Sequence, residues 1–206
     1  MDLRTIDADG SRFTYMEQGT GVPLVLLHGA GSGVRSWVRQ LDTLSARCRV
    51  IAWDGPGYGD STALPMDAPG PDEYIDALLK LVDALGVDRM HLVGHSLGAI
   101  QAARFARWHP ERLLGLTLSS MSAGHARLPE AERTRLREAR LSDLAALGVA
   151  GMAKKRGPRL LSSQATDEQR QAVIDTISRL RPEGFRRSKP QSLAVTCLQT
   201  EIAWPP

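Results

Sequence analysis

Cysteine is scarce in this chain of 206 residues, which contains only Cys48 and Cys197. The two cysteines form no C-x-x-C pair and no regularly spaced framework, so a disulfide-stapled secreted domain is not expected. The N-terminal segment MDLRTIDADG is charged and lacks the apolar core of a secretory signal. Scarce cysteine and no visible leader favour a reducing compartment, and we expect a cytoplasmic protein.

Long hydrophobic runs are also missing. No apolar run approaches the ~18 residues that a membrane-spanning helix requires, so no membrane association is expected. No cluster of Cys and His has the spacing of metal ligands, and the glycine-rich segments lack the lysine of a phosphate-binding loop. We therefore expect no metal and no organic cofactor.

The charge is unevenly distributed. Residues 1–100 contain 8 basic and 13 acidic residues, a net charge of −5, whereas residues 101–206 contain 18 basic and 10 acidic residues, a net charge of +8. A basic second half could suit an acidic partner, but acids are interspersed among the arginines, as is typical of solvated helices. We expect no nucleic-acid partner, and no oligomeric state is predicted.

Short apolar runs alternate with amphipathic segments from the N-terminus to Ser120. The runs are apolar throughout, which predicts strands buried on both faces of a sheet. A hairpin with a turn at Asp9-Gly10 precedes them. Strands that alternate with helices indicate an α/β fold, a mostly parallel sheet flanked by helices. The expected buried strands lie in VPLVLLHG (22–29), CRVIAWD (48–54), MHLVG (90–94) and RLLGLTLSS (112–120), and the expected helices in residues 36–47, 71–86 and 97–109.

The pattern changes after Ser120, where helical segments follow one another without strands. One segment starts at Pro129 and ends at Gly148, and another opens with Thr166 as an N-terminal cap and stops before Pro182. We therefore expect a core over residues 1–120 and a helical cap over residues 121–187. Residues 188–206 are expected to form a return helix toward the core.

The segment LVGHSLGAI carries the strongest indication of chemistry. Gly94-His95-Ser96-Leu97-Gly98 fits G-x-S-x-G, and it lies between an expected strand and an expected helix. A serine on so sharp a turn is strained, so its flanking positions must be small. The turn also places backbone N–H groups at a helix N-terminus, where they can hold a negative oxygen.

A second glycine-rich turn, His28-Gly29-Ala30-Gly31, follows the earlier strand PLVLL. Glycine there lets the backbone bend toward a neighbouring site. An N–H group of this loop can pair with the N–H of Leu97 and form the two-donor oxyanion hole that acyl transfer requires. The alternative is a plain strand-to-helix turn.

Three segments together, LLHGAGSG, DGPGYGDS and LVGHSLG, resemble the α/β-hydrolase fold family. Within it the chain looks like the capped hydrolases, which include esterases, enol-lactonases and meta-cleavage product hydrolases. The resemblance covers about Leu3 to Ser120, and the cap more loosely. A serine at the nucleophile position argues against a dehalogenase or an epoxide hydrolase, which would have Asp there.

The resemblance implies specific roles for residues of this chain. Ser96 corresponds to the nucleophile, and the N–H groups of Ala30 and Leu97 correspond to the oxyanion hole. The turn with Asp54, Gly57 and Gly59 matches a family turn that we interpret as structural. The supporting residues of the two motifs are His28, Gly29, Gly94, His95 and Gly98.

The family's order of serine, acid and histidine is interrupted in this sequence. PQSLAVTCLQTEIAW resembles the last cap helix, no later buried strand ends in G-x-D, and no histidine follows His125. Some members carry the acid directly after the fourth buried strand, but residues 119–122 are Ser-Ser-Met-Ser. Only His125 is considered as a base, whereas His91, His95 and His109 are expected to serve packing or turns. Asp143, Asp167 and Asp175 are expected on solvated faces of cap helices.

A serine hydroxyl without a base is a poor nucleophile. The sequence therefore predicts a truncated serine hydrolase that acts on a small carboxylic ester or lactone, and loss of activity in this form is an open alternative. A C–C bond hydrolase of the meta-cleavage type and a non-catalytic small-molecule-binding protein are the alternatives. A fragment that completes its site with another polypeptide is a further one, since an open sheet edge would permit pairing.

Overall fold

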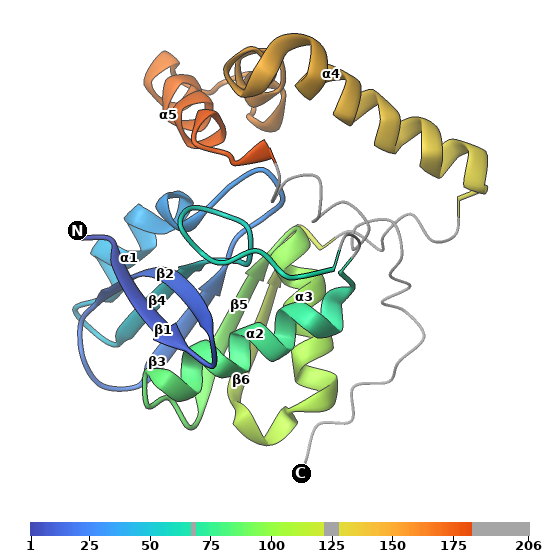
Figure 1. Ribbon diagram of the computed structural model, residues 1–206. Helices are drawn as coiled ribbons and strands as arrows, with labels where there is room; N and C mark the ends of the chain where they lie inside the picture. The colour runs from blue at the N-terminus through green and yellow to red at the C-terminus, as the bar shows by residue number, and fades with distance from the viewer. Residues whose placement is uncertain (67–68, 122–127, 183–206) are drawn as a thin grey trace.

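The computed structural model describes residues 1–66, 69–121 and 128–182. Within these ranges a six-stranded sheet has helices on both faces (Figure 1). The strands are β1 (Arg4–Ala8), β2 (Ser11–Gln18), β3 (Pro23–Leu27), β4 (Arg49–Asp54), β5 (Met90–His95) and β6 (Leu113–Ser119). The α-helices are α1 (Val38–Leu44), α2 (Pro71–Ala84), α3 (Leu97–Trp108), α4 (Glu130–Arg156) and α5 (Asp167–Ser178), and the 3-10 helices are η1 (Val34–Trp37), η2 (Pro110–Arg112) and η3 (Gly157–Leu160). A further layer, formed by α4 and α5, lies beyond the carboxyl ends of the parallel strands (Figure 1).

The strand order is β1-β2-β4-β3-β5-β6. β1 pairs with β2, and β2 with β4, in antiparallel fashion, whereas β4, β3, β5 and β6 are parallel to one another. From β3 the chain crosses to β4 on one side, and it then returns to β5 on the other side. In open α/β sheets, ligands bind beyond the carboxyl ends of the strands at such a reversal. The predicted α/β fold is confirmed, and its topology directs attention to the ends of β3 and β5.

The N-terminal hairpin has the predicted turn. Ala8 is opposite Ser11, and the two turn residues have positive φ angles of 46° at Asp9 and 73° at Gly10. Two consecutive residues with positive φ are what a tight two-residue hairpin requires, and Asp and Gly accept this conformation more readily than other residues. β2 then pairs with β4, so the hairpin extends the parallel part of the sheet.

Two apolar cores lie on opposite faces of the sheet. The core on the face covered by α2 and α3 includes Trp53 and Phe105, which are 1% and 0% exposed. The core on the other face includes Leu26, Val50 and Leu41, and it is covered by α1 and η1. Burial of this kind contributes about 25 cal/mol for each Å² of apolar surface removed from water, so both cores hold the strand ends in place.

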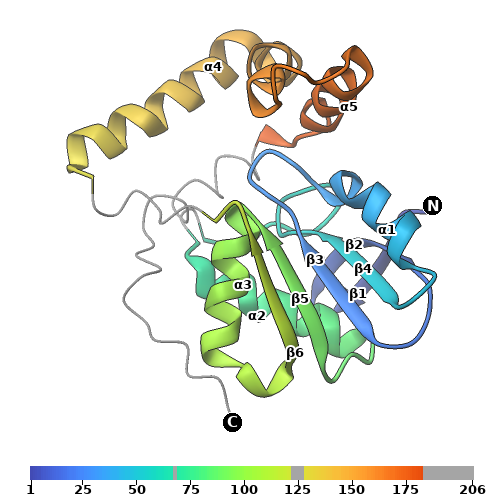
Figure 2. The same cartoon turned by 180° about the vertical axis from the view of Figure 1, so that it is seen from behind.

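The prediction that all four apolar strands are buried on both faces is correct for β3 and β4 but wrong for β5 and β6. His91 and His95 of β5 are exposed, and Leu114 of β6 is 41% exposed. The reason is the position of α1, which packs against β2 and β4 at the other side of the sheet. Seen from behind, no described helix lies in front of β5 and β6 (Figure 2).

Between residues 128 and 182 the chain contains helices and no strand, as the sequence pattern predicts. Thr166 caps α5: its side chain accepts from the N–H of Gln169, whose own side chain accepts from the N–H of Thr166. Gly148 breaks the helical geometry of α4 with a φ of 63°, but the helix resumes and continues to Arg156, which was not predicted. The expected return helix of residues 188–206 lies outside the described residues. In the described ranges, no helix is both long enough and apolar enough to cross a membrane.

Candidate active site

Ser96 lies between the end of β5 and the start of α3, with φ 53° and ψ −111°. A positive φ in a residue other than glycine costs free energy and is usually retained only where the surrounding structure enforces it. The N–H of Ser96 donates to the carbonyl oxygen of Ser119, at 2.9 Å, so the turn is fixed to the end of β6. Ser96 occupies the N-cap position of α3, but its side chain makes no capping hydrogen bond. The strained backbone therefore withholds the hydroxyl from the helix.

The glycines around Ser96 are required by close contacts of the backbone. A Cβ atom at Gly94 would lie 2.2 Å from the carbonyl oxygen of Gly98, and one at Gly98 would lie 2.3 Å from the carbonyl oxygen of Leu27. Both distances are far inside van der Waals contact. The two small residues of G-x-S-x-G thus let α3 approach its own strand and the end of β3.

The loop after β3 runs directly beside the turn at Ser96. A Cβ atom at Gly29 would lie 3.0 Å from Nδ1 of His95 and 3.2 Å from Cβ of Ser96. Ala30 follows Gly29, and Leu97 opens α3, where the first N–H groups of a helix have no acceptor within the helix. Gly29 thus borders Ser96 in space, Ala30 follows it in the chain, and Leu97 is the residue directly after Ser96.

His28 is fixed by backbone groups on both sides of its ring. The N–H of Gly55 donates to Nε2 at 3.0 Å, so Nδ1 carries the proton and donates to the carbonyl oxygen of Gly29 at 2.9 Å. Burial lowers the pKa of His28, and the nearby Asp54 carboxyl opposes this only in part. His28 is therefore a neutral structural residue of the loop and is not available as a base.

Of the remaining histidines whose positions the structure describes, only His95 is near Ser96. Its ring is exposed and lies edge-to-face with Trp37, with 6.5 Å between the ring centroids. His91 precedes Ser96 by five strand residues, roughly 16 Å along β5, and His109 lies beyond the far end of α3. His125 lies outside the described residues.

Within residues 1–66, 69–121 and 128–182, no side chain forms a hydrogen bond with the hydroxyl of Ser96. The cap carboxylates are engaged elsewhere or exposed. Asp143 pairs with Lys155 at 2.6 Å and with Arg156, across the break at Gly148, and these partners lower its pKa. Its side chain is 13% exposed and lies against these two basic side chains.

Asp54 fastens two loops at the end of β4, in line with the structural role given to its turn. Its Oδ1 accepts from the N–H of Val34 at 2.8 Å, and Cβ atoms at Gly33 or Gly59 would lie 2.8 Å and 2.2 Å from its carboxylate oxygens. Ser61 continues this attachment: its hydroxyl donates to the carbonyl oxygen of Asp54 at 2.7 Å and accepts from the N–H of Thr14. Burial raises the pKa of Asp54 above its ordinary value.

Tyr58, to which no role was given from the sequence, is buried in the same turn. Its ring lies edge-to-face with the ring of His28, with 4.6 Å between the centroids. A cavity of about 180 Å³ lies between this turn, residues 32–35 and the end of α5. Ser96 does not line it. The only indication in the sequence was a bulky aromatic residue between two glycines, which does not reveal its contacts.

No group of three or more His, Cys, Asp or Glu side chains in the described ranges is arranged to hold a metal ion. The geometry provides a serine hydroxyl that makes no capping bond, on a strained turn whose neighbouring glycines are in close backbone contact.

Comparison with known proteins assigns the chain to a family. A family model described as alpha/beta hydrolase fold matches residues 22–144, more than half of the chain. The chain belongs to the α/β-hydrolase fold family.

Several of the relatives are named as hydrolases. Over 101 residues the chain is 41% identical to an (E)-2-((N-methylformamido)methylene)succinate hydrolase of Acinetobacter baylyi, a match that covers 48% of this chain and 38% of that protein. Over 123 residues it is 38% identical to a 2-hydroxy-6-oxononadienedioate/2-hydroxy-6-oxononatrienedioate hydrolase of Burkholderia vietnamiensis, covering 57% and 43%. The matches thus span about two fifths of the length of these curated relatives.

Among solved structures, a thermophilic esterase from Thermogutta terrifontis is similar to this chain with a TM-score of 0.75 and 25% identity. The superposition covers 95% of this chain and 72% of the esterase chain. The likeness therefore includes the helical layer as well as the sheet.

Proposed function

We propose that the chain carries the nucleophile and the oxyanion donors of a serine hydrolase. The observation that carries the proposal is the conformation of Ser96. A serine at a helix N-cap ordinarily accepts a hydrogen bond from the first turn, whereas Ser96 is held at φ 53° with no such bond. The surrounding glycines enforce this strained turn, and strain of this kind clusters at functional sites.

The proposed chemistry is acyl transfer. The hydroxyl oxygen of Ser96 attacks the carbonyl carbon of a small ester or lactone, and the proton of the hydroxyl passes to a base. The carbonyl oxygen becomes negative and accepts hydrogen bonds from the N–H groups of Ala30 and Leu97. Collapse expels the alcohol, which takes up a proton, and leaves an acyl group on Ser96. Water then hydrolyses this acyl group and restores the free serine.

The proposal assigns no base within the described residues, because His28 is committed to backbone groups and no side chain bonds to the hydroxyl of Ser96. Without a base, only a residual rate of roughly 10³–10⁴ over water is expected from the oxyanion hole and substrate binding. This limit supports a second candidate, a small-molecule-binding protein with no turnover.

The relatives support the substrate class in part. The Thermogutta protein is an esterase by name, and the Acinetobacter and Burkholderia proteins are named as hydrolases of a substituted succinate and of dienedioates. A small ester or lactone is the proposed substrate, and hydrolysis of a C–C bond next to a carbonyl is the alternative. We also propose that the helices of residues 121–187 act as a cap over the end of the sheet, with residues 1–120 as the core.

Reaction with a fluorophosphonate tests the proposal, because this reagent phosphonylates activated serines. The native chain is expected to react faster than the denatured chain, and mass spectrometry is expected to place the label on Ser96. Ser96→Ala should abolish the label, whereas Ser163→Ala, at an exposed serine before α5, should retain it. A native chain that reacts no faster than the denatured one would contradict the assignment of Ser96 and favour the binding protein.

A further inference from the structure

Tyr58 is the residue through which the helical layer contacts the loop beside Ser96. It lies in the turn after β4, and its side chain is only 2% exposed. The turn itself is closed by hydrogen bonds from the N–H of Tyr58 to the carbonyl oxygen of Gly55, at 2.9 Å, and from the N–H of Ser61 to the carbonyl oxygen of Tyr58, at 3.0 Å. Because its side chain is buried and its turn is closed by these hydrogen bonds, Tyr58 is held in one position.

One side of Tyr58 contacts the loop that carries Ala30. Its ring packs edge-to-face against His28, at a centroid distance of 4.6 Å, and its hydroxyl accepts from the N–H of Gly31 at 3.5 Å. His28 and Gly31 are the two ends of the segment that contains Gly29 and Ala30. Tyr58 thus holds this short segment at both ends.

The other side of Tyr58 belongs to the apolar cluster of the helical layer. The buried members of this cluster come from α4, from α5 and from the residue pair after α5, with Tyr58 as the only one from residues 1–120. Leu180 also lines the 180 Å³ cavity together with Tyr58. The buried cluster consists of Tyr58, Leu144, Met152, Ala153, Ile177 and Leu180.

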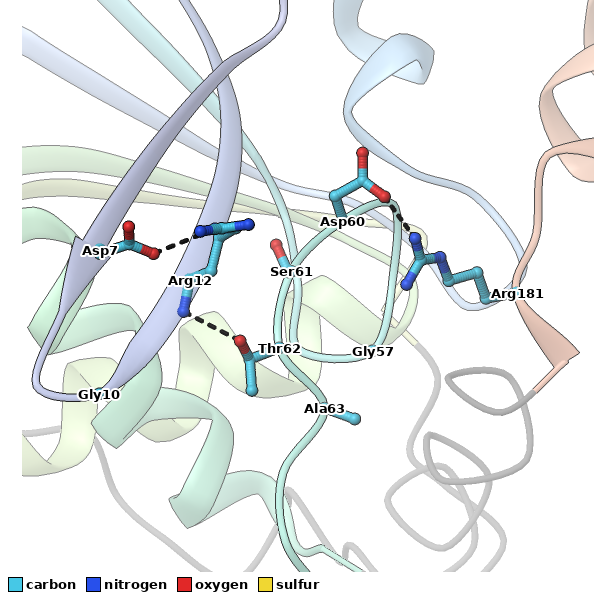
Figure 3. Close-up of a pocket in the computed structure, with 9 residues that line it drawn as sticks. All are labelled: Asp7, Gly10, Arg12, Gly57, Asp60, Ser61, Thr62, Ala63 and Arg181. Atoms are coloured by element: carbon cyan, nitrogen blue, oxygen red, sulfur yellow. Dashed lines mark hydrogen bonds and ion pairs between the residues drawn. The ribbon is translucent and has the colours of Figure 1, made fainter.

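The turn around Tyr58 is fixed to the sheet beneath it. The N–H of Thr62 donates to the carbonyl oxygen of Arg12 at 2.8 Å. On its outer side the turn borders a cavity of about 460 Å³, where Asp60 pairs with Arg181 just beyond α5 (Figure 3). The turn therefore bridges a rigid sheet on one side and the helical layer on the other.

We infer that Tyr58 is a positioning residue that sets the Ala30 N–H against Ser96 and makes this placement depend on the packing of the helical layer. The inference rests on the proposed role of Ala30 as an oxyanion donor. The physical reason is that Tyr58 contacts both ends of the short segment that carries Ala30, His28 through its ring and Gly31 through its hydroxyl. Loss of the ring or of its hydroxyl would allow the segment 28–31 to shift away from the turn at Ser96.

Two substitutions separate the hydroxyl of Tyr58 from its ring. Tyr58→Phe keeps the ring contacts and removes the acceptor for the N–H of Gly31. It is expected to slow the limiting rate of Ser96 phosphonylation about fivefold, the factor of one neutral hydrogen bond, with the reagent's binding constant unchanged. Tyr58→Leu also removes the ring and is expected to slow this rate by up to roughly 100-fold, as a misplacement of about 1 Å can.

The matched control is Tyr15→Phe, which makes the same chemical change at a buried tyrosine of β2. It should leave both the rate and the binding constant of phosphonylation unchanged. Amide hydrogen exchange over residues 28–32 gives a second readout that requires no chemistry at Ser96. Exchange of the Gly31 amide should accelerate in Tyr58→Phe but not in Tyr15→Phe.

Coupling to the helical layer is tested by a double-mutant cycle. Leu180→Ala is expected to slow phosphonylation, although Leu180 lies more than 80 residues from Ser96 in the sequence. In the Tyr58→Leu background the same change should have no further effect, because the contact that transmits it is gone. Additive effects would overturn the coupling between the layer and the loop.

The outcomes also separate this inference from the proposed function. If native Ser96 does not react at all, the proposed function fails, and hydrogen exchange over residues 28–32 still decides the role of Tyr58. If Ser96 reacts but Tyr58→Phe matches Tyr15→Phe in rate and in exchange, the positioning role is wrong and the serine hydrolase proposal stands.

Discussion

The core beneath Ser96 and the helical layer above it are stabilised in different ways. The core on the α2 and α3 face joins 18 buried residues, among them Trp53 and Phe105, whereas the layer's cluster has six and takes one of them, Tyr58, from the core. The core also contains backbone contacts so close that only glycine fits, as at Gly98. The layer instead carries a cluster of ion pairs around Asp143.

This difference implies different responses to perturbation. A close-packed core with buried apolar groups unfolds as a unit, whereas a layer with few buried groups can open on its own at lower free energy. Ser96 lies on the close-packed core, whereas the residues of α4 and α5 that contact Tyr58 lie in the helical layer. The turn at Ser96 is therefore expected to keep its conformation when the helical layer opens.

The largest expected effect is that of a methyl group at Gly98. Gly98→Ala would place Cβ 2.3 Å from the carbonyl oxygen of Leu27, a backbone atom that can move only with β3. We expect a loss of about 3 kcal/mol or more in the free energy of unfolding, measured by urea denaturation. Gly10→Ala is the control, because its Cβ meets nothing within 4 Å and only the φ of 73° is unfavourable. It should cost about 1–2 kcal/mol, and equal losses would refute close packing as the cause.

A matched pair of leucines compares the two regions directly. Leu81→Ala in the core and Leu144→Ala in the layer remove the same atoms from sites that are 0% and 5% exposed. Leu81→Ala should lower the free energy of global unfolding by about 2–5 kcal/mol. Leu144→Ala should accelerate hydrogen exchange in α4 and α5 and leave β3 and β5 protected. Faster exchange of β3 and β5 amides in Leu144→Ala would show that layer and core unfold together.

The smallest expected effect is that of the Asp143 carboxylate. Lys155 and Arg156 hold the pKa of Asp143 below its ordinary value, so the charged form stabilises the fold. This contribution is complete above the ordinary aspartate pKa of about 3.9 and is lost as the pH falls through the lowered value. Asp143→Asn should therefore lower the thermal midpoint of α4 helicity at pH 7 but not under strongly acidic conditions. Asp175→Asn, which loses only a hydrogen bond from Gln171, serves as the control; a deficit that persists in acid would exclude the ion pairs as its cause.

Features of the fold set by neighbouring residues were predictable from the sequence. The turn at Asp9-Gly10, the cap at Thr166 and the strand–turn–helix around Ser96 depend on a few adjacent residues, and all three are found. The second face of β5 and β6 was mispredicted, because its exposure depends on where α1 lies across the sheet.

In the candidate site, too, some features follow from adjacent residues and others depend on residues far apart in the sequence. The glycines beside Ser96 follow from local geometry, whereas the contact of Tyr58 with α5 joins residues about 120 positions apart. The ion pairs of Asp143 span 12 and 13 residues across the break at Gly148, a spacing that a continuous helix would not suggest. Periodicity along one segment carries no information on either contact, so both required the three-dimensional structure.

The edge-to-face contact of Trp37 with His95 gives the site an optical reporter. Of the other tryptophans in residues 1–182 that the structure describes, Trp53 is buried and Trp108 is half-exposed beneath two arginine side chains. The fluorescence of Trp37 therefore reports on the surroundings of the residue next to Ser96, and binding at this turn can be followed in solution before any substrate is known.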